Sequence, residues 1–540
     1  MGFLDPVKPP YDALEWAQRP FDERSKMVCA AWALQGYGTP LAVYALYAFK
    51  VLFYVAGWWL SCSFTPGLGG LADIGAWWLH PVAFQKAILW SLLFEVLGLG
   101  CGSGPLTGRY LPPVGGFLYF LRPGTTKLPL WPALGTRRTW LDVALYGALL
   151  GVLVAALIAA FPDPRMFLAV AVLLAVLGVL DRTIFLAARA EHYWTAVVVF
   201  AFAADFVPGA KAVWAALWFW AGVSKLNHHF PSVVCVMTSN SPFTRFAWLR
   251  KRMYRKYPGD LAPSRLAVIA HGGTILEFAV PTLLLLGDGG PLTIAGLIAM
   301  LLLHGFITSN VPMGVPIEWN VMMVYGGFVL FWKHAAASLA DIPWPLALFL
   351  AVMLVALPLA GNLWPSRVSF LMAMRYYAGN WAYSIWLFKR GSHTKLDKLV
   401  KSAPWVPDQL EKMYDRGTAA GIVSKVMGFR LMHLHGRALP LLIPKAVERL
   451  EDYDWVDGEL VAGMVLGWNF GDGHLHDEAL LAAVQAQCGF EPGELRCIFV
   501  EAQPLGKPGL GYRIADASTG RMAEGEVEVR ELRARAPWVA

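Results

Sequence analysis

Charged residues are scarce in this chain. Of its 540 residues, only 15% are Asp, Glu, Lys or Arg, whereas 57% are hydrophobic. A soluble protein carries roughly a quarter charged residues. The sequence therefore lacks the polar side chains that would cover a water-facing surface of this size, and this composition excludes an ordinary soluble protein.

Cysteine is scarce too, and the motifs of several enzyme classes are missing. The six cysteines form no CxxC pair and no disulfide framework. GxSxG, P-loop and CxxCH motifs are absent, as are the His boxes of membrane desaturases. The polar, Pro-rich start has no apolar h-region, so we expect no cleavable signal peptide.

Long apolar runs are what the sequence does contain. Each approaches the ~20 residues that cross about 30 Å of hydrocarbon as a helix, the shorter ones only with flanking residues recruited. The runs are Thr39–Phe64, Phe84–Cys101, Trp140–Phe161, Met166–Leu186, Trp194–Val207, Val213–Val223, Leu266–Leu286, Leu292–Ile307, Val321–Trp332 and Trp344–Leu363. We predict an all-α polytopic membrane protein with about ten transmembrane helices and a small C-terminal α+β soluble domain.

Composition divides the chain into four parts. We expect an N-terminal cytoplasmic cap at 1–37, a transmembrane helical domain at 38–363 and a soluble cytoplasmic α+β domain at 392–540. Between the last two, residues 364–391 include "RYYAGNWAYSIWLFKRG", whose aromatic and basic residues are typical of a segment at the lipid headgroups. The runs "LRCIFVEAQ", "GYRIADA" and "EGEVEVREL" predict strands.

Basic residues indicate the topology. They concentrate at 102–139 and 245–265, whereas the connections at 65–82 and 287–291 contain no Lys or Arg. The positive-inside rule then makes the basic loops cytoplasmic, and with about ten spans both termini as well. Attraction to anionic lipid explains these charges, so we expect membrane lipids as partners and no nucleic acid.

Ionisable residues inside spans are costly, so each is a candidate site residue. We consider Glu95, Asp205, Lys211, Lys225, His228, His229, His271, Glu277, His304, Glu318 and Asn320. Some have simpler explanations. Lys211 and Asp205 flank a Pro-Gly turn, and Glu95 and Asp181 could each pair with a neighbouring cation.

The stretch "HGFITSNVPMGVPIEWN" (304–320) is the strongest candidate. Pro312, Gly314 and Pro316 must break the helix there. Irregular backbone at membrane depth is tolerated where it lines a cavity, so we favour a re-entrant lining over a plain cytoplasmic loop. We assign His304 and Glu318 catalytic roles. The substrate-binding candidates are His228, His229, His271, Glu277, Asn310 and Asn320.

Lys225 has two interpretations from its position alone. A lysine at the end of a span can extend its ammonium to the interface, with His228 and His229 beside it. A partly desolvated lysine can instead act as a general base. We expect Lys225, His304 and Glu318 to share one cavity, with Glu318 away from the lysine.

Two resemblances bear on this choice. "FWAGVSKLNHHFPSV" resembles the segment of vitamin K-dependent γ-glutamyl carboxylases and their horizontally transferred transmembrane relatives that carries the base lysine, at Lys225 here. "GSGPLTGRYLPPVGGFLYFLRPGTTKLPLWP", "NVPMGVPIEWNV" and "MRYYAGNWAYSIWLF" resemble a bacterial transmembrane family, domain of unknown function 3556, over nearly the whole chain. The second resemblance implies a multi-pass protein of the bacterial inner membrane.

The first resemblance implies a pocket with a basic lysine rather than γ-carboxylation itself, because the chain has no equivalent of the lumenal glutamate-substrate domain. We therefore expect an enzyme that acts on a lipid or an isoprenoid quinone, with Lys225 as general base. The alternative is a non-catalytic lipid-binding or assembly subunit of a larger membrane-protein complex. A transporter is disfavoured, because the two halves of the membrane domain show no repeat.

The sequence contains two His-x-His pairs, His433/His435 and His474/His476. On a strand, the two histidines of each pair would project from the same face. Histidines in Gly-rich turns are commonly only turn residues, so we predict no metal site.

Overall fold

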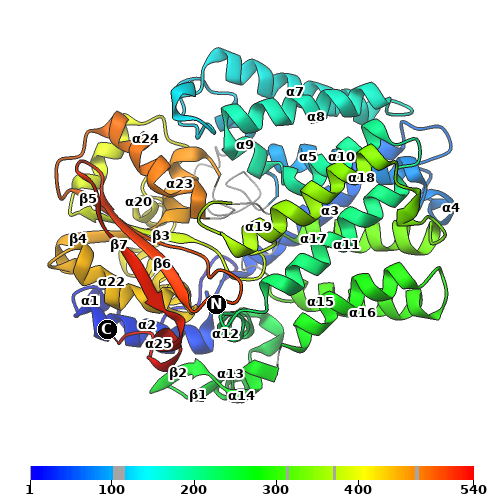
Figure 1. Cartoon of the computed structure of the whole chain (residues 1–540). Helices are drawn as coiled ribbons and strands as arrows, with labels where there is room; N and C mark the ends of the chain where they lie inside the picture. Colours follow the sequence, from blue (N-terminus) through cyan, green and yellow to red (C-terminus); the bar gives the residue numbers. More distant parts are fainter. Residues whose placement is uncertain are drawn as a thin grey trace.

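The computed structural model describes residues 2–100, 116–269, 271–311, 316–368, 373–468 and 473–539. The chain is mostly helical, with a small sheet near its C-terminus. Figure 1 shows the two parts side by side: a bundle of long helices, and the sheet with its own helices. The mostly helical fold and the small sheet near the C-terminus agree with the predicted fold class.

The helix bundle is built from residues 41–363. Its helices are α3 (Leu41–Cys62), α4 (Ile74–Trp77), α5 (Pro81–Val96), α6 (Phe117–Phe120), α7 (Trp140–Ile158), α8 (Pro164–Leu180), α9 (Arg182–Ala187), α10 (Ala190–Phe202), α11 (Val207–Ser224), α12 (Phe230–Asn240), α13 (Ala247–Arg252), α14 (Arg265–Ile269), α15 (Gly272–Leu286), α16 (Pro291–Thr308), α17 (Ile317–Gly327), α18 (Trp344–Ala351) and α19 (Leu357–Leu363). π-Helical turns at Phe328–Lys333 and Val352–Ala356 extend α17 and join α18 to α19.

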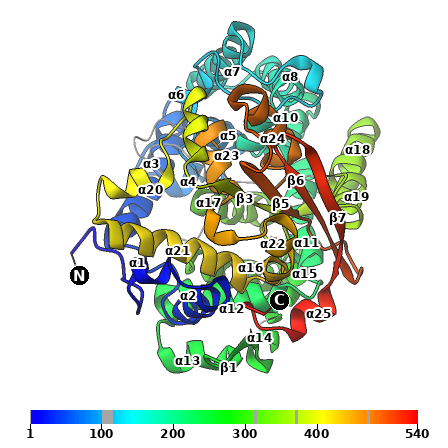
Figure 2. The ribbon, with the colours of Figure 1, turned by 90° about the vertical axis from the view of Figure 1, so that its left-hand side faces the viewer.

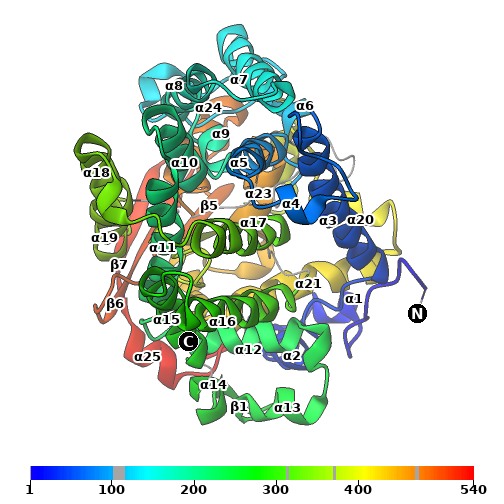
Figure 3. The same ribbon diagram turned by 90° about the vertical axis from the view of Figure 1, so that its right-hand side faces the viewer.

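Five helical segments in the described chain are long and apolar enough to cross a membrane, so the predicted count of about ten is not confirmed. They are Leu41–Cys62, Trp140–Ile158, Arg265–Leu286, Pro291–Thr308 and Trp344–Leu363. Several other predicted spans form shorter helices, such as α10 and α17. Apolar helices of 10–14 residues are typically buried inside a larger bundle. In Figure 3, α5 and α17 accordingly lie between the peripheral helices α3, α7 and α18.

The sheet has five antiparallel strands in the order β4-β3-β5-β6-β7. They are β3 (Tyr383–Lys389), β4 (Tyr453–Asp457), β5 (Leu495–Val500), β6 (Gly509–Asp516) and β7 (Gly520–Glu528). The last three overlap the predicted strands, although the end of "EGEVEVREL" forms helix α25 (Val529–Ala534) and not strand. A separate two-stranded hairpin, β1 (Tyr254–Lys256) and β2 (Asp260–Pro263), lies in the basic 245–265 region.

The structure differs from the expectation that 364–391 lies at the lipid headgroups. Its last part is β3, a strand paired on both sides, with Tyr383 and Trp386 2% and 0% exposed. The physical reason is that aromatic residues followed by a basic end are as typical of a buried strand as of an interfacial segment. The sheet region therefore begins within the predicted interfacial segment.

The helices around the sheet are α20 (Val406–Glu411), α21 (Arg416–Met432), α22 (Leu439–Ala446), α23 (Gly458–Leu466), α24 (Glu478–Cys488) and α25 (Val529–Ala534). The N-terminal helices α1 (Ala13–Trp16) and α2 (Phe21–Gln35) pack against α21 (Figure 2).

One hydrophobic core joins this end of the molecule. It contains Trp32 of α2, Val236 of α12, Leu261 of β2, Leu431 of α21 and Ile498 of β5, among others. The N-terminal segment, the basic hairpin and the C-terminal domain thus lie at the same end. That arrangement is what a shared side of the membrane would require.

Candidate functional site

A cavity of ≈ 670 Å³ lies where the helix bundle meets the C-terminal domain. Helices α3, α11, α12, α15, α16 and α17 line it from the bundle, and α20, α21 and α23 from the other part. Its wall is mainly apolar and aromatic with a few polar groups, which is the usual make-up of a small-molecule site. The lining residues Leu4 and Met413 are 52% and 48% exposed, so the cavity reaches the surface near the start of α3.

Lys225 and Glu277 form an ion pair in the cavity wall. Lys225 is the C-cap residue of α11, and Glu277 projects from α15. Their side chains are 9% and 3% exposed, and the Lys225 ammonium contacts Glu277 Oε1. The ring of Phe230 lies 5.5 Å from the ammonium nitrogen. Lys225 is therefore one half of a buried pair and not an isolated amine.

His304 also lines the cavity, but both of its ring nitrogens already have partners. The Trp218 indole N–H donates to Nε2 at 2.9 Å, so Nδ1 carries the proton and donates to Asn320 Oδ1 at 2.8 Å. The Asn320 amide in turn donates to the Pro316 carbonyl at 2.8 Å. This chain fixes the imidazole tautomer, and the ring offers the cavity its apolar face.

A row of aromatic rings continues from His304 along the cavity wall. It begins with Trp319, 6.4 Å from the His304 ring centroid, and Tyr377 stacks on Trp319 at 5.2 Å. Tyr376, Trp381 and Phe429 follow at centroid distances of 5.9, 5.6 and 6.4 Å. All of these rings line the cavity. They supply a continuous apolar surface along the cavity wall.

Arg430 of α21 forms the second polar end. Its Nε and Nη2 donate to Asp457 Oδ2 at 2.8 and 2.7 Å, and Glu459 Oε1 lies 3.7 Å from Nη2. Burial opposes the charge, yet these two carboxylates raise the pKa of Arg430 above its ordinary value. Beside it, burial lowers the pKa of His433 to about 3, so that imidazole is neutral.

Glu318 does not line the cavity. It is 2% exposed, and its Oε2 lies 3.2 Å from Lys50 Nζ. Nearby, Arg189 pairs with Glu95 at 2.7 Å and donates to the Tyr377 hydroxyl. Glu318 therefore does not contact the Lys225 ammonium, as expected. It pairs with Lys50 instead and does not contact His304.

The remaining predicted residues lie outside the cavity wall. The His229 Nε2 lies 3.0 Å from the Ala378 carbonyl, and His228 is exposed with Nδ1 3.3 Å from Arg533. His271 bonds Thr274 at 3.1 Å and packs on the far side of Phe230. Asn310 caps the end of α16 by donating to the Phe306 carbonyl at 2.7 Å.

Pro312 and Gly314 of the predicted re-entrant break lie outside the described residues, whereas Pro316 borders the cavity. The structure therefore brings together Lys225, Glu277, His304 and Asn320 from the predicted set.

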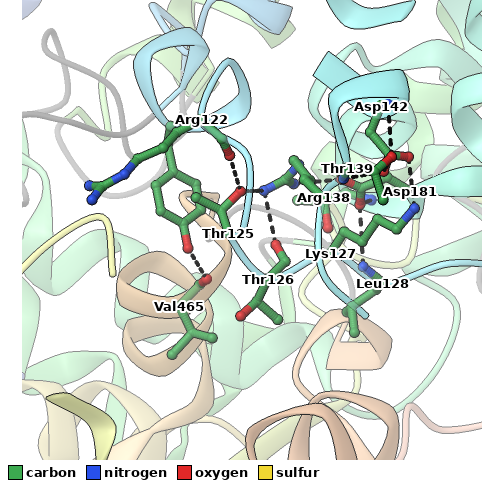
Figure 4. A network of polar contacts seen from close by, with 12 residues as sticks. Arg122, Thr125, Thr126, Lys127, Leu128, Arg138, Thr139, Asp142, Asp181 and Val465 are labelled. Atoms are coloured by element: carbon green, nitrogen blue, oxygen red, sulfur yellow. Dashed lines mark hydrogen bonds and ion pairs between the residues drawn. The ribbon is translucent and has the colours of Figure 1, made fainter. Parts of the chain in front are cut away.

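The other ionisable candidates are satisfied inside the fold. Lys211 donates to the Ala335 and Ala337 carbonyls at 2.8 and 2.6 Å. Asp181 pairs with Arg138 at 2.5 Å, within a network that also contains the Lys127–Asp142 pair (Figure 4). Buried charges are tolerated in this way when they are paired and hydrogen-bonded.

The described part of the chain contains no group of three His, Cys, Asp or Glu side chains that could hold a metal ion. Each of the four histidines in the His-x-His pairs forms a hydrogen bond with a different residue. His433 bonds Phe429, His435 bonds Asn380, His474 bonds Glu501 and His476 bonds Ser384.

Comparison with known families identifies the family of this chain. A family model described as a transmembrane protein of unknown function (DUF3556) matches residues 1–540. The chain belongs to this family. No curated protein and no solved structure matches it. Membership confirms the predicted membrane protein and assigns no activity.

The sequence analysis did not identify Arg430 and Asp457, which both line the cavity. Arg430 stands in the apolar stretch "VMGFRLMHL", and an arginine surrounded by Met, Phe and Leu is a signal of a paired buried charge. Its partner could not be found, because Asp457 lies in another element and looks like an ordinary helix N-cap.

Proposed function

We propose that this membrane protein binds a lipid or an isoprenoid quinone in the cavity, with Lys225 and Glu277 contacting its polar group. The observation that carries the proposal is an apolar cavity with a buried ammonium–carboxylate pair in its wall. An ammonium donates hydrogen bonds and a carboxylate accepts them, so the pair suits a head group with both kinds of atom. The aromatic row would contact the apolar part.

The exposed lining at Leu4 and Met413 supports entry from the membrane. Both residues border the cavity near the start of α3, a helix long enough to span. Because we place both residues on the cytoplasmic side, an amphiphile would enter there from the lipid headgroups around the start of α3. We place the protein in the bacterial inner membrane, with both termini cytoplasmic, because of the basic loops and the resemblances described above.

Catalysis with Lys225 as general base is the more demanding version of this proposal. The resemblance to the carboxylase lysine favours it. The contact with Glu277 weighs against it, because the Lys225 Nζ already has this carboxylate as a partner in the cavity wall. The bonded nitrogens of His304 also weigh against a proton-transfer role for that residue. The geometry supports the binding role, alone or within a larger membrane complex, better than the catalytic one.

Analysis of co-purified molecules tests the proposal. The full chain would be purified in a mild detergent, and bound lipids and quinones extracted and quantified by mass spectrometry. We expect Lys225→Met and Glu277→Gln to lose most of the bound molecule. Lys211→Met is the matched control, because Lys211 lies on the same helix, is buried and does not line the cavity. Equal retention in all variants would reject the assigned contact.

A further inference from the structure

The segment 241–269 carries exposed aromatic side chains beside exposed cations. Phe243, Phe246 and Trp248 are 73%, 57% and 60% exposed. The ring centroids of Phe246 and Trp248 lie 6.5 Å apart, and the guanidinium carbon of Arg252 lies 5.7 Å from the Trp248 centroid. Large apolar side chains that gather at a protein surface commonly mark a binding surface for a protein or a membrane.

This surface belongs to the folded part of the molecule. Arg250 is 5% exposed and ties the segment to helix α2. Its Nε and Nη2 donate to the carbonyls of Thr244 and Ser241 at 2.9 and 2.8 Å, and its Nη1 donates to the Leu34 carbonyl. Tyr254 of β1 is buried in the core that α2 and α12 share. The inner side of the segment is therefore anchored, and the three aromatic rings project from a fixed base.

The charge of the segment is almost entirely positive. Between residues 241 and 269 the only carboxylate is Asp260, whose Oδ2 lies 3.0 Å from Arg255. A surface with one sign of charge favours a partner of the opposite sign. The exposed cations are Arg245, Lys251, Arg252, Arg255, Lys256 and Arg265.

The position of the segment indicates which anionic partner it meets. Figures 1 and 3 both place α13, α14 and β1 at the lower edge of the molecule. Arg265 begins Arg265–Leu286, one of the five helical segments long enough to cross a membrane. A nucleic acid or an acidic protein would match the charge, but lipid headgroups also account for the position at the end of a span.

The exposed rings add to what the charges alone explain. The positive-inside rule accounts for cations next to a span, but it does not call for exposed Phe and Trp side chains. Aromatic residues combined with Lys and Arg are typical of segments that lie in the headgroup region, where the rings enter the boundary with the acyl chains.

We infer that the segment 241–269 is a membrane-surface contact, in which Phe243, Phe246 and Trp248 insert among the headgroups and the surrounding cations bind the phosphate groups of anionic lipids. Each cation near an anionic leaflet strengthens such binding about fivefold. None of the residues 241–269 that the structure describes lines the cavity, so this inference does not depend on the proposed function.

Fluorescence quenching tests the insertion. The full chain with Trp248→Cys would be labelled with the dye NBD and reconstituted into vesicles of dioleoylphosphatidylcholine and dioleoylphosphatidylglycerol. Met522→Cys is the matched control, because Met522 is 43% exposed and lies on β7 of the sheet. The native cysteines Cys29, Cys62, Cys235, Cys488 and Cys497 are buried, and labelled wild-type chain supplies the background.

Lipids that carry a nitroxide near the headgroup should then lower the fluorescence of the dye at position 248 and leave it unchanged at position 522. Equal fluorescence loss at the two positions, or none at position 248, would overturn the insertion of this surface.

Hydrogen–deuterium exchange tests the choice of lipid. The full chain would be placed in nanodiscs of dioleoylphosphatidylcholine, alone or mixed in equal parts with dioleoylphosphatidylglycerol. We expect the backbone amides of 241–269 to exchange more slowly in the anionic mixture. Lys251→Gln/Arg252→Gln should lose most of this difference, because two cations contribute about 25-fold together. Lys389→Gln/Arg390→Gln is the matched control, since these are two neighbouring exposed cations at the end of β3. It should keep the difference.

Equal exchange of the wild-type chain in the two nanodiscs would overturn the contact with anionic lipid and leave an acidic macromolecule as the partner of these cations. A Lys251→Gln/Arg252→Gln chain that keeps the full difference would overturn the role of the α13 cations. Neither measurement involves a molecule in the cavity. A failure of the proposed function would therefore leave both results unchanged.

Discussion

Replacing Glu277 by Gln would leave the Lys225 ammonium buried beside a neutral amide. The two side chains are 9% and 3% exposed, so water can replace the lost carboxylate only in small part. Removing one partner of a buried pair costs about 3–5 kcal/mol. The Phe230 ring, 5.5 Å from the ammonium, retains a cation–π attraction of about 0.5–2 kcal/mol, so we expect a loss of roughly 3 kcal/mol.

Lys225→Met should cost a similar amount, because it leaves a buried carboxylate. The double variant Lys225→Met/Glu277→Gln contains neither charge. Its free energy of unfolding should therefore lie within about 1–2 kcal/mol of the wild-type value, well above the sum of the two single losses. The free energies would be measured by SDS titration in mixed micelles, with tryptophan fluorescence as the signal.

The control cycle combines Glu277→Gln with Lys211→Met. Lys211 donates to backbone carbonyls at the other end of α11 and has no contact with Glu277 among the described residues. These two changes should be additive within about 0.5 kcal/mol. Additivity of the Lys225 and Glu277 changes as well would refute the reasoning, because it would show that the two charges do not stabilise each other.

Three further predictions each concern one side chain. Lys225→Arg keeps the charge but cannot act as a base, so binding of decylubiquinone should persist; if a cell-based complementation assay then shows full function too, a catalytic base is refuted. Trp218→Phe leaves His304 Nε2 without its donor and should lower the free energy of unfolding by about 1–3 kcal/mol, whereas an unchanged value would show that this bond is not needed. Burial lowers the pKa of Lys425 to about 8 from 10.5, so between these values the unfolded chain binds the extra proton. Stability should then rise with pH over that window, and a Lys425→Met variant with the same slope would contradict this.

The sequence predicted the helical regions and part of the site, because both depend on local signals. Apolar runs mark helices whatever their partners are, and a lysine that ends such a run, like Lys225, is visible without a structure. Glu277, His304 and Asn320 were found for the same reason. Each is a polar residue in a sequence that is otherwise apolar.

What the sequence could not give was pairing across the chain. Glu318 looked like a site residue because Lys50, its partner, is 268 residues away in the sequence. The predicted number of spans is not confirmed, because a short buried helix such as α10 is as apolar as a membrane-crossing one and apolarity alone does not separate the two. Likewise β3 has the aromatic content of an interfacial segment, and only its neighbours β4 and β5 identify it as a strand.

Burial alone does not separate functional from structural charges in this protein. Three ion pairs inside the helix bundle are all nearly inaccessible to water: Lys225–Glu277, Lys50–Glu318 and Arg189–Glu95. Only Lys225 and Glu277 border the cavity, so they alone can exchange partners with a bound molecule without unpacking a helix. A bound molecule must therefore supply polar atoms that compensate for the part of the Lys225–Glu277 contact that it displaces.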